Sequence, residues 1–190
     1  MGLQSNQTTQ IMIRKFTAII CTAVLFLHAA CRQENERMAE KIKETEKKLV
    51  NDSTKMMNRP LAEEQLKAYS DFTDKFPDDQ RSEEFLYKAA DLANGLGKTP
   101  VALELYHRFG EKYPNSSKAA YAMFLQGFIY ENQLKNLDKA KELYTLFLSK
   151  YPTHELAKDA KFSLDNLGKS EEELIKMFEE KNKAENASAK

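Results

Sequence analysis

Aromatic residues recur at a helical spacing in three segments of the chain, and each segment ends in a Lys-aromatic-Pro triplet. A Tyr and a Phe stand eight and five residues before each Pro. Together with the aromatic residue before the Pro, they occupy positions i, i+3 and i+7 of one helix face. Each Pro then ends its helix, because it lacks an N–H group and restricts the residue before it. The sets are Tyr69, Phe72, Phe76 and Pro77; Tyr106, Phe109, Tyr113 and Pro114; and Tyr144, Phe147, Tyr151 and Pro152.

Ala-rich segments come after each Pro and predict a second set of helices, over residues 81–94, 116–132 and 154–167. Ser116 and Ser117 are candidate N-caps for the second of these. The Pro residues are 37 and 38 positions apart, so one helix pair repeats along the chain. Because one pair cannot bury its apolar face alone, the pattern predicts an all-α array of stacked antiparallel helix pairs. We expect the Tyr/Phe/Pro helices to form its convex layer and the Ala-rich helices to line its concave side.

The order of landmarks in this repeat resembles the tetratricopeptide repeat family. Gly127, Tyr130, Ala140, Tyr144 and Pro152 follow the family's Gly-x-x-Tyr, Ala, aromatic and Pro positions. The family's leading Trp is replaced here, and the period is longer than the family's usual one. The resemblance implies a right-handed superhelical array over residues 60–168. The longer period with Tyr-Pro endings is similar to a bacterial envelope subgroup, which includes outer-membrane assembly lipoproteins and the Tol-Pal-associated periplasmic repeat protein.

The first thirty residues predict a targeting segment. Arg14 and Lys15 precede an apolar run over residues 16–30, which contains no charge. A run of that length reaches only about 22 Å as a helix, whereas a membrane span needs roughly 20 residues. Basic residues before a short apolar run are typical of a secretory signal peptide over residues 1–30. Met12 is a second candidate for the start.

The end of this run, Leu27-His28-Ala29-Ala30-Cys31, resembles the lipobox of bacterial lipoproteins, although His28 stands where that family usually has Leu. The resemblance implies that Cys31 is lipid-modified and becomes the first mature residue. An ordinary signal peptide cut near Ala30, or an uncleaved anchor, are the alternatives. The residue after the cysteine, Arg32, is not the Asp that retains some enteric lipoproteins at the inner membrane. By that analogy we expect an outer-membrane protein. We expect it to face the periplasm, with the cell exterior as the alternative.

The segments that flank the repeats have a different character. Residues 31–59 are highly charged and predict a helical stalk or an N-terminal cap. Within them, residues 34–50 are a short candidate coiled coil, which would give a homo-oligomer. Ser170 and Glu173 form the pattern of a capping box at the start of a C-terminal capping helix over residues 169–183. Residues 184–190 are small and polar, and we expect them to form a disordered tail.

Composition narrows the function classes. The chain of 190 residues has 29 Lys and Arg against 29 Asp and Glu, so its net charge gives no basis for nucleic-acid binding. Two Cys cannot form a four-Cys zinc site. After the signal segment only His107 and His154 remain, and they share no motif. We find no catalytic motif, so the sequence predicts a protein that is not an enzyme and has no cofactor and no metal.

The resemblance implies that the first helix of each pair lines a concave groove. The groove candidates suit an extended peptide or a partner helix. Packing of Phe124 and Phe128 between the repeats is an equally open interpretation. Counted from Gly127, the candidates are Tyr121, Phe124, Phe128 and Glu131, preceded one repeat earlier by Glu84, Tyr87, Asp91 and Asn94.

These expectations combine into one functional hypothesis. The chain would be a non-catalytic protein-interaction scaffold that is anchored in the bacterial envelope through Cys31 and binds other envelope proteins or peptides. By resemblance, it would support the assembly of outer-membrane proteins or the organisation of the envelope. The alternative is a peptide- or glycan-binding accessory module with an aromatic-lined groove.

Overall fold

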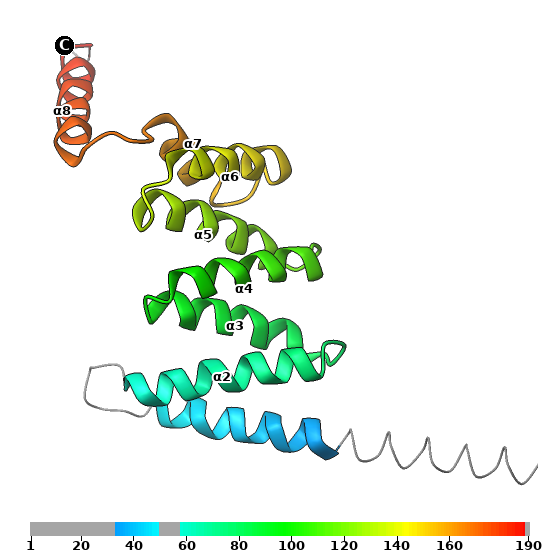
Figure 1. Ribbon diagram of the computed structural model, residues 1–190. Coiled ribbons are helices and arrows are strands. Elements are labelled where there is room, and N and C mark those ends of the chain that lie inside the picture. The colour runs from blue at the N-terminus through cyan, green and yellow to red at the C-terminus, as the bar shows by residue number, and fades with distance from the viewer. Residues whose placement is uncertain (1–32, 50–57, 189–190) are drawn as a thin grey trace, which may run out of the picture. The chain divides into compact units, whose positions relative to one another are not determined.

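The computed structural model describes residues 33–49 and 58–188, and every regular element within those ranges is a helix (Figure 1). The chain divides into two compact units, Met1–Pro77 and Asp78–Lys190. The predicted signal peptide and its lipidation residue Cys31 lie outside the described residues, as does the end of the predicted tail. Within the described ranges, no helix combines the length and the apolar character that a membrane span requires.

The first unit contains a helix over residues 33–49 and α2 (Arg59–Lys75), which pack side by side in opposite directions (Figure 1). Ile42 is 1% exposed, and its backbone carbonyl accepts a hydrogen bond from Gln65 Nε2 at 3.3 Å. The Tyr69 hydroxyl donates to a carboxylate oxygen of Glu46. The charged segment is therefore half of a packed helix pair rather than a free stalk.

This packing also changes the expectation for residues 34–50. A coiled coil needs an apolar seam that a second chain can cover. Ala39 and Ile42, the buried apolar residues of the helix, are each 1% exposed within the chain itself. The predicted oligomer contact is therefore not supported, because the seam on which it depended is already covered by α2.

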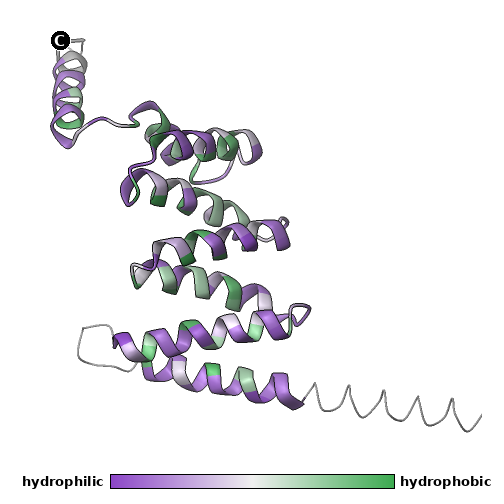
Figure 2. Cartoon of the chain, viewed as in Figure 1, coloured by the Kyte–Doolittle hydropathy of each residue, from purple (hydrophilic) through white to green (hydrophobic). Residues whose placement is uncertain are grey.

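The second unit is a helical solenoid, in which each helix from α3 to α7 packs on the next one along the chain (Figure 1). The helix α5 carries mostly apolar residues (Figure 2), since neighbours cover it on both sides. The helices are α3 (Arg81–Gly95), α4 (Thr99–Lys112), α5 (Ala119–Asn132), α6 (Leu137–Lys150), α7 (Ala157–Asp165) and α8 (Glu171–Ser188).

The predicted helix ends before the three Pro residues are confirmed. The helices α2, α4 and α6 each end at the Lys of the triplet, and the next residue, the aromatic one, is the C-cap. Its backbone N–H donates to the carbonyl of the Phe four residues earlier, at 2.8, 2.8 and 2.7 Å. In each triplet the Lys Nζ lies 5.5 to 5.8 Å from the centre of the aromatic ring. One sequence pattern thus produces one local structure three times.

The predicted starts of two Ala-rich helices are wrong. The helix α5 begins at Ala119 rather than at residue 116, and α7 begins at Ala157 rather than at residue 154. Ser116 Oγ accepts from the Lys118 N–H at 3.1 Å, and His154 Nδ1 accepts from the N–H two residues later at 3.2 Å. These side chains stabilise a turn before the helix, so Ser116 is not the N-cap of α5.

The core between α5, α6 and α7 is built from small residues that face two large rings. Ala120, Ala140 and Ala160 surround Tyr144 and Phe147, and all five are at most 3% exposed. The glycine of α5 belongs to the same arrangement, because a Cβ there would lie 2.9 Å from the Tyr144 ring. Close approach of α5 and α6 therefore requires a residue without a side chain at position 127.

The predicted capping box at the start of α8 is confirmed. The Ser170 N–H donates to Glu173 Oε2 at 2.8 Å, and the Glu173 N–H donates to Ser170 Oγ at 3.2 Å. The helix then continues to Ser188, beyond the predicted end at residue 183 and into the segment expected to be disordered. Phe178 of α8 stacks on Phe162 of α7, with ring centres 6.0 Å apart.

Candidate functional site

The predicted groove residue Tyr87 of α3 is part of the packing between α3 and α4. Its ring meets Tyr106 and Phe109 edge-on, with centroid distances of 6.1 and 5.2 Å. Lys118 Nζ lies 4.8 Å from the same ring. Desolvation, and then the negative charge of Asp91, raise the pKa of the Tyr87 hydroxyl to about 12. Tyr87 is therefore half-buried structure rather than an open contact surface.

Two predicted groove carboxylates are hydrogen-bond acceptors for the large tyrosines of the second helices. The Tyr106 hydroxyl donates to Asp91 at 2.6 Å, and the Tyr144 hydroxyl donates to Glu131 at 2.7 Å. Burial raises the pKa of Tyr106 and of Tyr144, and the adjacent carboxylates raise it further. Desolvation likewise raises the pKa of Asp91, against the lowering effect of the Tyr106 hydrogen bond. These bonds join the two helices of each pair.

Two further candidates connect one helix pair to its neighbour. The Tyr121 ring meets His154 edge-on at 5.0 Å, and its hydroxyl donates to Glu155. Asn94 Oδ1 accepts from Gln133 Nε2 at 2.9 Å. His154 also lies against the ring of Phe147, at 5.8 Å between centroids. This histidine therefore serves the packing of aromatic residues.

The sequence left open whether Phe124 and Phe128 face the groove or pack between the repeats, and the structure gives a different answer for each. Phe124 packs on Tyr144 and Phe147 of α6, at 5.7 and 5.9 Å between ring centroids, and so belongs to the core. Phe128, one turn further along α5, is 44% exposed. Glu84, the remaining candidate, is exposed and forms an ion pair with Lys88 of its own helix at 2.6 Å. Among the predicted groove aromatics, Phe128 alone keeps a large open face.

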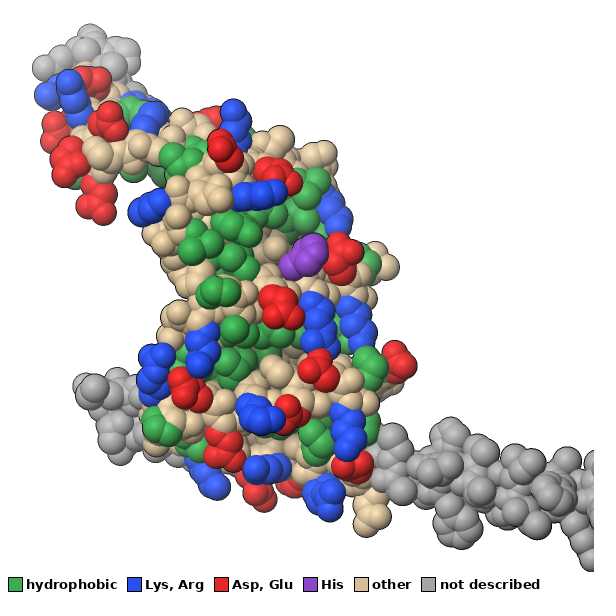
Figure 3. Space-filling view, viewed as in Figure 1, with side chains coloured by type: hydrophobic (Ala, Val, Ile, Leu, Met, Phe, Trp, Pro, Cys, Tyr) green, Lys and Arg blue, Asp and Glu red, His purple; other side chains and the backbone are tan. Residues whose placement is uncertain are grey.

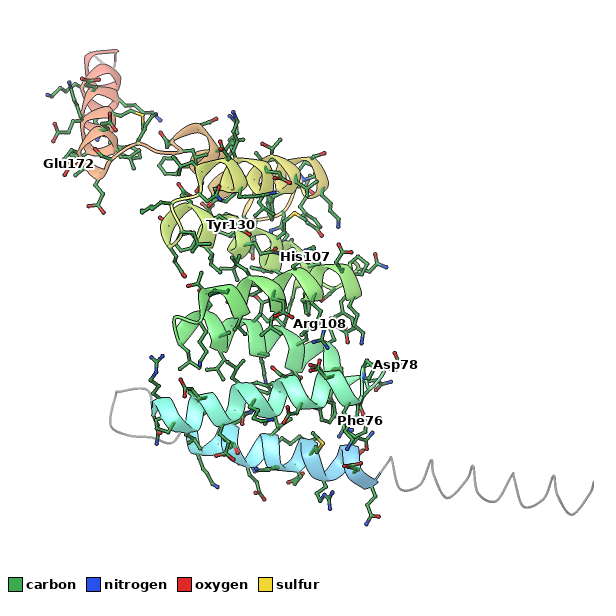
Figure 4. All side chains as sticks on the ribbon, viewed as in Figure 1. Phe76, Asp78, His107, Arg108, Tyr130 and Glu172 are labelled. Atoms are coloured by element: carbon green, nitrogen blue, oxygen red, sulfur yellow. The ribbon has the colours of Figure 1, made fainter. Side chains whose placement is uncertain are left out.

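A hollow of about 520 Å³ lies elsewhere, between α4 and α6, with α5 as its floor. Figure 3 shows hydrophobic side chains gathered beside His107, and Figure 4 shows that His107 and Tyr130 come from α4 and α5. The repeat register did not predict this hollow. Its signal in the sequence is Gly110, which stands where the matching position of α6 is Leu148. A Cβ at Gly110 would meet nothing within 4 Å.

The described residues do not form a metal site, because no three His, Cys, Asp or Glu side chains among them come together. His107 lies at the hollow and His154 in the aromatic packing of α5 to α7. The structure therefore gives the two histidines separate surroundings.

Comparison with known families agrees with this architecture. Residues 84–116 and 121–154 match the family model of the tetratricopeptide repeat. These two segments are tetratricopeptide repeats. The first comprises α3 and α4, and the second comprises α5 and α6. No curated protein matches the chain.

Tetratricopeptide repeats are typically non-catalytic modules for protein–protein interaction, and the two matched segments suggest a role of that general kind. The helix pair of the first unit lies outside the match, although its tyrosine also donates to a carboxylate of the preceding helix. The matching position is Ala102 in the first repeat and Ala140 in the second, but it is the larger Gln65 in the helix pair of the first unit. The two matched repeats thus have the family's small residue at this position, and the unmatched helix pair does not.

Proposed function

We propose that this protein is a non-catalytic interaction scaffold of the bacterial envelope, anchored in the membrane by lipid at Cys31. One observation carries the binding role: Phe128 is 44% exposed on α5, while its neighbours on the same face hold the repeats together. Exposed aromatic side chains on a rigid support are typical centres of protein interfaces. Phe128 thus offers an anchor that needs no rearrangement to bind.

The hydrogen bonds of the surrounding residues explain why this support is rigid. Tyr144 holds Glu131 on the last turn of α5, and Tyr121 holds the loop before α7 through Glu155. The residues around Phe128 therefore lose little conformational entropy when a partner covers this surface. An extended peptide or a partner helix that supplies one large apolar side chain fits this surface.

The proposed location in the cell rests on the sequence. The apolar run before Cys31, its length and its final small residues support export and lipid modification, and Arg32 supports sorting to the outer membrane. The periplasmic face of that membrane is the expected side. Within that compartment the scaffold would support outer-membrane protein assembly or envelope organisation. These roles require a binding surface held at the membrane, which the anchor and the repeats together provide.

Crosslinking in the native cell, followed by purification through a C-terminal tag and mass spectrometry, tests the binding role. We expect the wild-type chain to recover a defined envelope protein and Phe128→Glu to lose it. Val101→Glu is the matched control, because Val101 is also exposed, at 39%, but lies on α4. Equal recovery by Phe128→Glu and the wild type would refute the proposed surface. Recovery of glycan rather than protein would favour the accessory-module alternative.

The anchor is tested separately with Cys31→Ser. We expect this variant to leave the membrane fraction and to lose metabolic labelling by a fatty acid, while its helices remain folded. Lipid anchoring would be contradicted if Cys31→Ser stayed in the membrane fraction and the wild type took up no fatty-acid label. That result would leave the binding test unaffected.

A further inference from the structure

The hollow between α4 and α6 lies on the opposite side of α5 from Phe128. Its floor includes Met123, Gln126 and Tyr130. With 3.6 residues per turn, these residues point roughly 150° away from Phe124 and Phe128. A ligand in the hollow would therefore leave the surface of the proposed function free.

Part of the lining of the hollow is apolar. Met123 and Tyr130 of α5, Leu103 of α4 and Leu143 of α6 line it. Leu146 stands on the α6 wall and is 48% exposed, so much of its side chain remains in contact with water. Covering an exposed leucine and the apolar floor beneath it would be favourable, since burial of apolar surface drives association. The occupant must therefore present apolar side chains.

The walls of the hollow differ in charge. The α4 wall carries Glu104 and Glu111, and neither makes an ion pair with any residue of the described ranges. On the α6 wall, Lys139 is already paired with Glu142 at 2.7 Å, and Lys150 lies over the Tyr151 ring at 5.5 Å. Lys150 therefore keeps its positive charge, while the two carboxylates on the α4 wall have no ion-pair partner within the described ranges. This pair of acidic residues favours a basic occupant on the α4 side of the hollow.

The spacing of the acidic residues indicates the form of the occupant. Glu104 and Glu111 are seven residues apart on α4, which corresponds to about 10.5 Å or two helical turns. Basic residues seven apart on a second helix have the same rise and could meet both carboxylates. The lining runs from Leu103 to Glu111 on α4 and from Lys139 to Lys150 on α6, which corresponds to about 12 and 16 Å along these helices. The hollow therefore suits two to three turns of a partner helix.

We propose that the hollow between α4 and α6 binds an amphipathic helix of a partner protein. Its apolar side lies on Leu146 and the floor of α5, and its Lys or Arg residues, two turns apart, pair with Glu104 and Glu111. Helix-binding grooves contact the apolar stripe of an amphipathic helix, and charged residues beside the groove select the orientation of that helix. This is a second interaction surface, independent of Phe128.

The test uses the full-length protein in detergent and two synthetic helical peptides with the same apolar stripe. One peptide carries two Lys seven residues apart on one flank, and the other carries two Glu at the same positions. Fluorescence anisotropy measures the dissociation constants. We expect the Lys peptide to bind roughly tenfold more tightly than the Glu peptide. That difference should shrink at high salt, because exposed charges are screened.

Three variants decide whether this binding occurs in the hollow. The double variant Glu104→Lys, Glu111→Lys should reverse the preference between the peptides, and Leu146→Asp should abolish binding of both. Phe128→Glu should leave both constants unchanged. Circular dichroism of each variant verifies that the helices are intact.

Other outcomes would overturn the proposal. Equal affinity for both peptides, or the same preference after charge reversal on α4, would mean that the acidic wall does not select the ligand. Loss of binding in Phe128→Glu would place the peptide on the other face of α5. Self-association of the chain that Leu146→Asp abolishes would instead identify a second copy as the occupant.

Discussion

Phe124 and Phe162 stand 38 residues apart at the same position of successive repeats, but their surroundings differ. Phe124 packs on two rings of the next helix, Tyr144 and Phe147. Phe162 is 44% exposed, and its ring neighbour is Phe178 alone among the described side chains. The difference lies in the next helix of the chain, since α6 carries Tyr and Phe three residues apart and α8 carries one aromatic residue.

The comparison separates two contributions to the core. The position of a residue within the repeat decides which way its side chain points. Its burial depends on whether the next helix supplies a complementary face, because nearest-neighbour contacts stabilise a repeat array. We call the pairs α3–α4 and α5–α6 closed, because the next helix covers their aromatic side chains. We call α7 open, because α8 covers its Phe162 only in part. This distinction sets the expected stabilities of variants at matched positions.

The largest expected effect is at the closed position. Phe147 is fully buried, so Phe147→Ala should lower the free energy of unfolding by about 3–5 kcal/mol. The matched change at the open end, Phe178→Ala, should cost less than about 1 kcal/mol, because that ring is 46% exposed. Urea unfolding followed by circular dichroism measures both. Equal losses would show that α7 and α8 are packed as firmly as the closed repeats.

A pair of glycine substitutions sharpens the same comparison. A Cβ at Gly127 would lie 2.9 Å from the Tyr144 ring, so Gly127→Ala should cost about 1–3 kcal/mol through overpacking. A Cβ at Gly110 in α4 meets nothing within 4 Å, so Gly110→Ala should stabilise the helix by about 0.5–1 kcal/mol. Thermal unfolding gives the sign of each change. Stabilisation by both substitutions would contradict the close approach of α5 and α6.

A smaller difference in stability is expected between variants of Tyr144 in α6 and of Tyr151, the C-cap of the same helix. Tyr144→Phe removes the hydrogen bond to Glu131 and should cost about 1 kcal/mol. The buried hydroxyl of Tyr151 has no hydrogen-bond partner among the described residues, so Tyr151→Phe should be neutral or slightly stabilising. Denaturant midpoints of the two variants are compared directly. A greater loss in Tyr151→Phe would mean that the hydroxyl contacts of α6 are wrongly assigned.

The last effect appears only at alkaline pH. Folding raises the pKa of Tyr87 from 10.0 to about 12, so the folded state keeps its proton where the unfolded chain has lost it. This contribution to stability is complete below pH 10 and disappears as the pH rises through about 12. Tyr87→Phe should therefore flatten the pH dependence of unfolding in that window. The same slope in the variant and the wild type would exclude Tyr87 as its source.

The sequence predicted the repeated elements well where one residue type controls the geometry. Each Pro ends a helix at the preceding Lys, since its effect on the backbone is local. The start of α7 was predicted less well, because His154 Nδ1 accepts a backbone hydrogen bond that only the folded turn provides. Phe124 and Phe128 have the same residue type and register face, and their different burial depends on rings of α6 that lie far along the chain.

The candidate site shows the same limit more strongly. Polar residues assigned to the groove, such as Asp91 and Glu131, accept hydrogen bonds from buried tyrosines, and sequence spacing does not reveal that pairing. The hollow between α4 and α6 depends on the separation of two helices across a third. Its clue, Gly110, is a single small residue whose meaning appears only when the space around it is known.

The central claim is that the closed repeats form a rigid support with Phe128 as its binding surface. A photoreactive amino acid placed at position 128 in the native cell tests it most directly, with the same group at position 101 as the control. We predict that position 128 crosslinks to one specific envelope protein and that position 101 does not. Crosslinks from both positions to the same set of abundant proteins, or from neither, would contradict the claim.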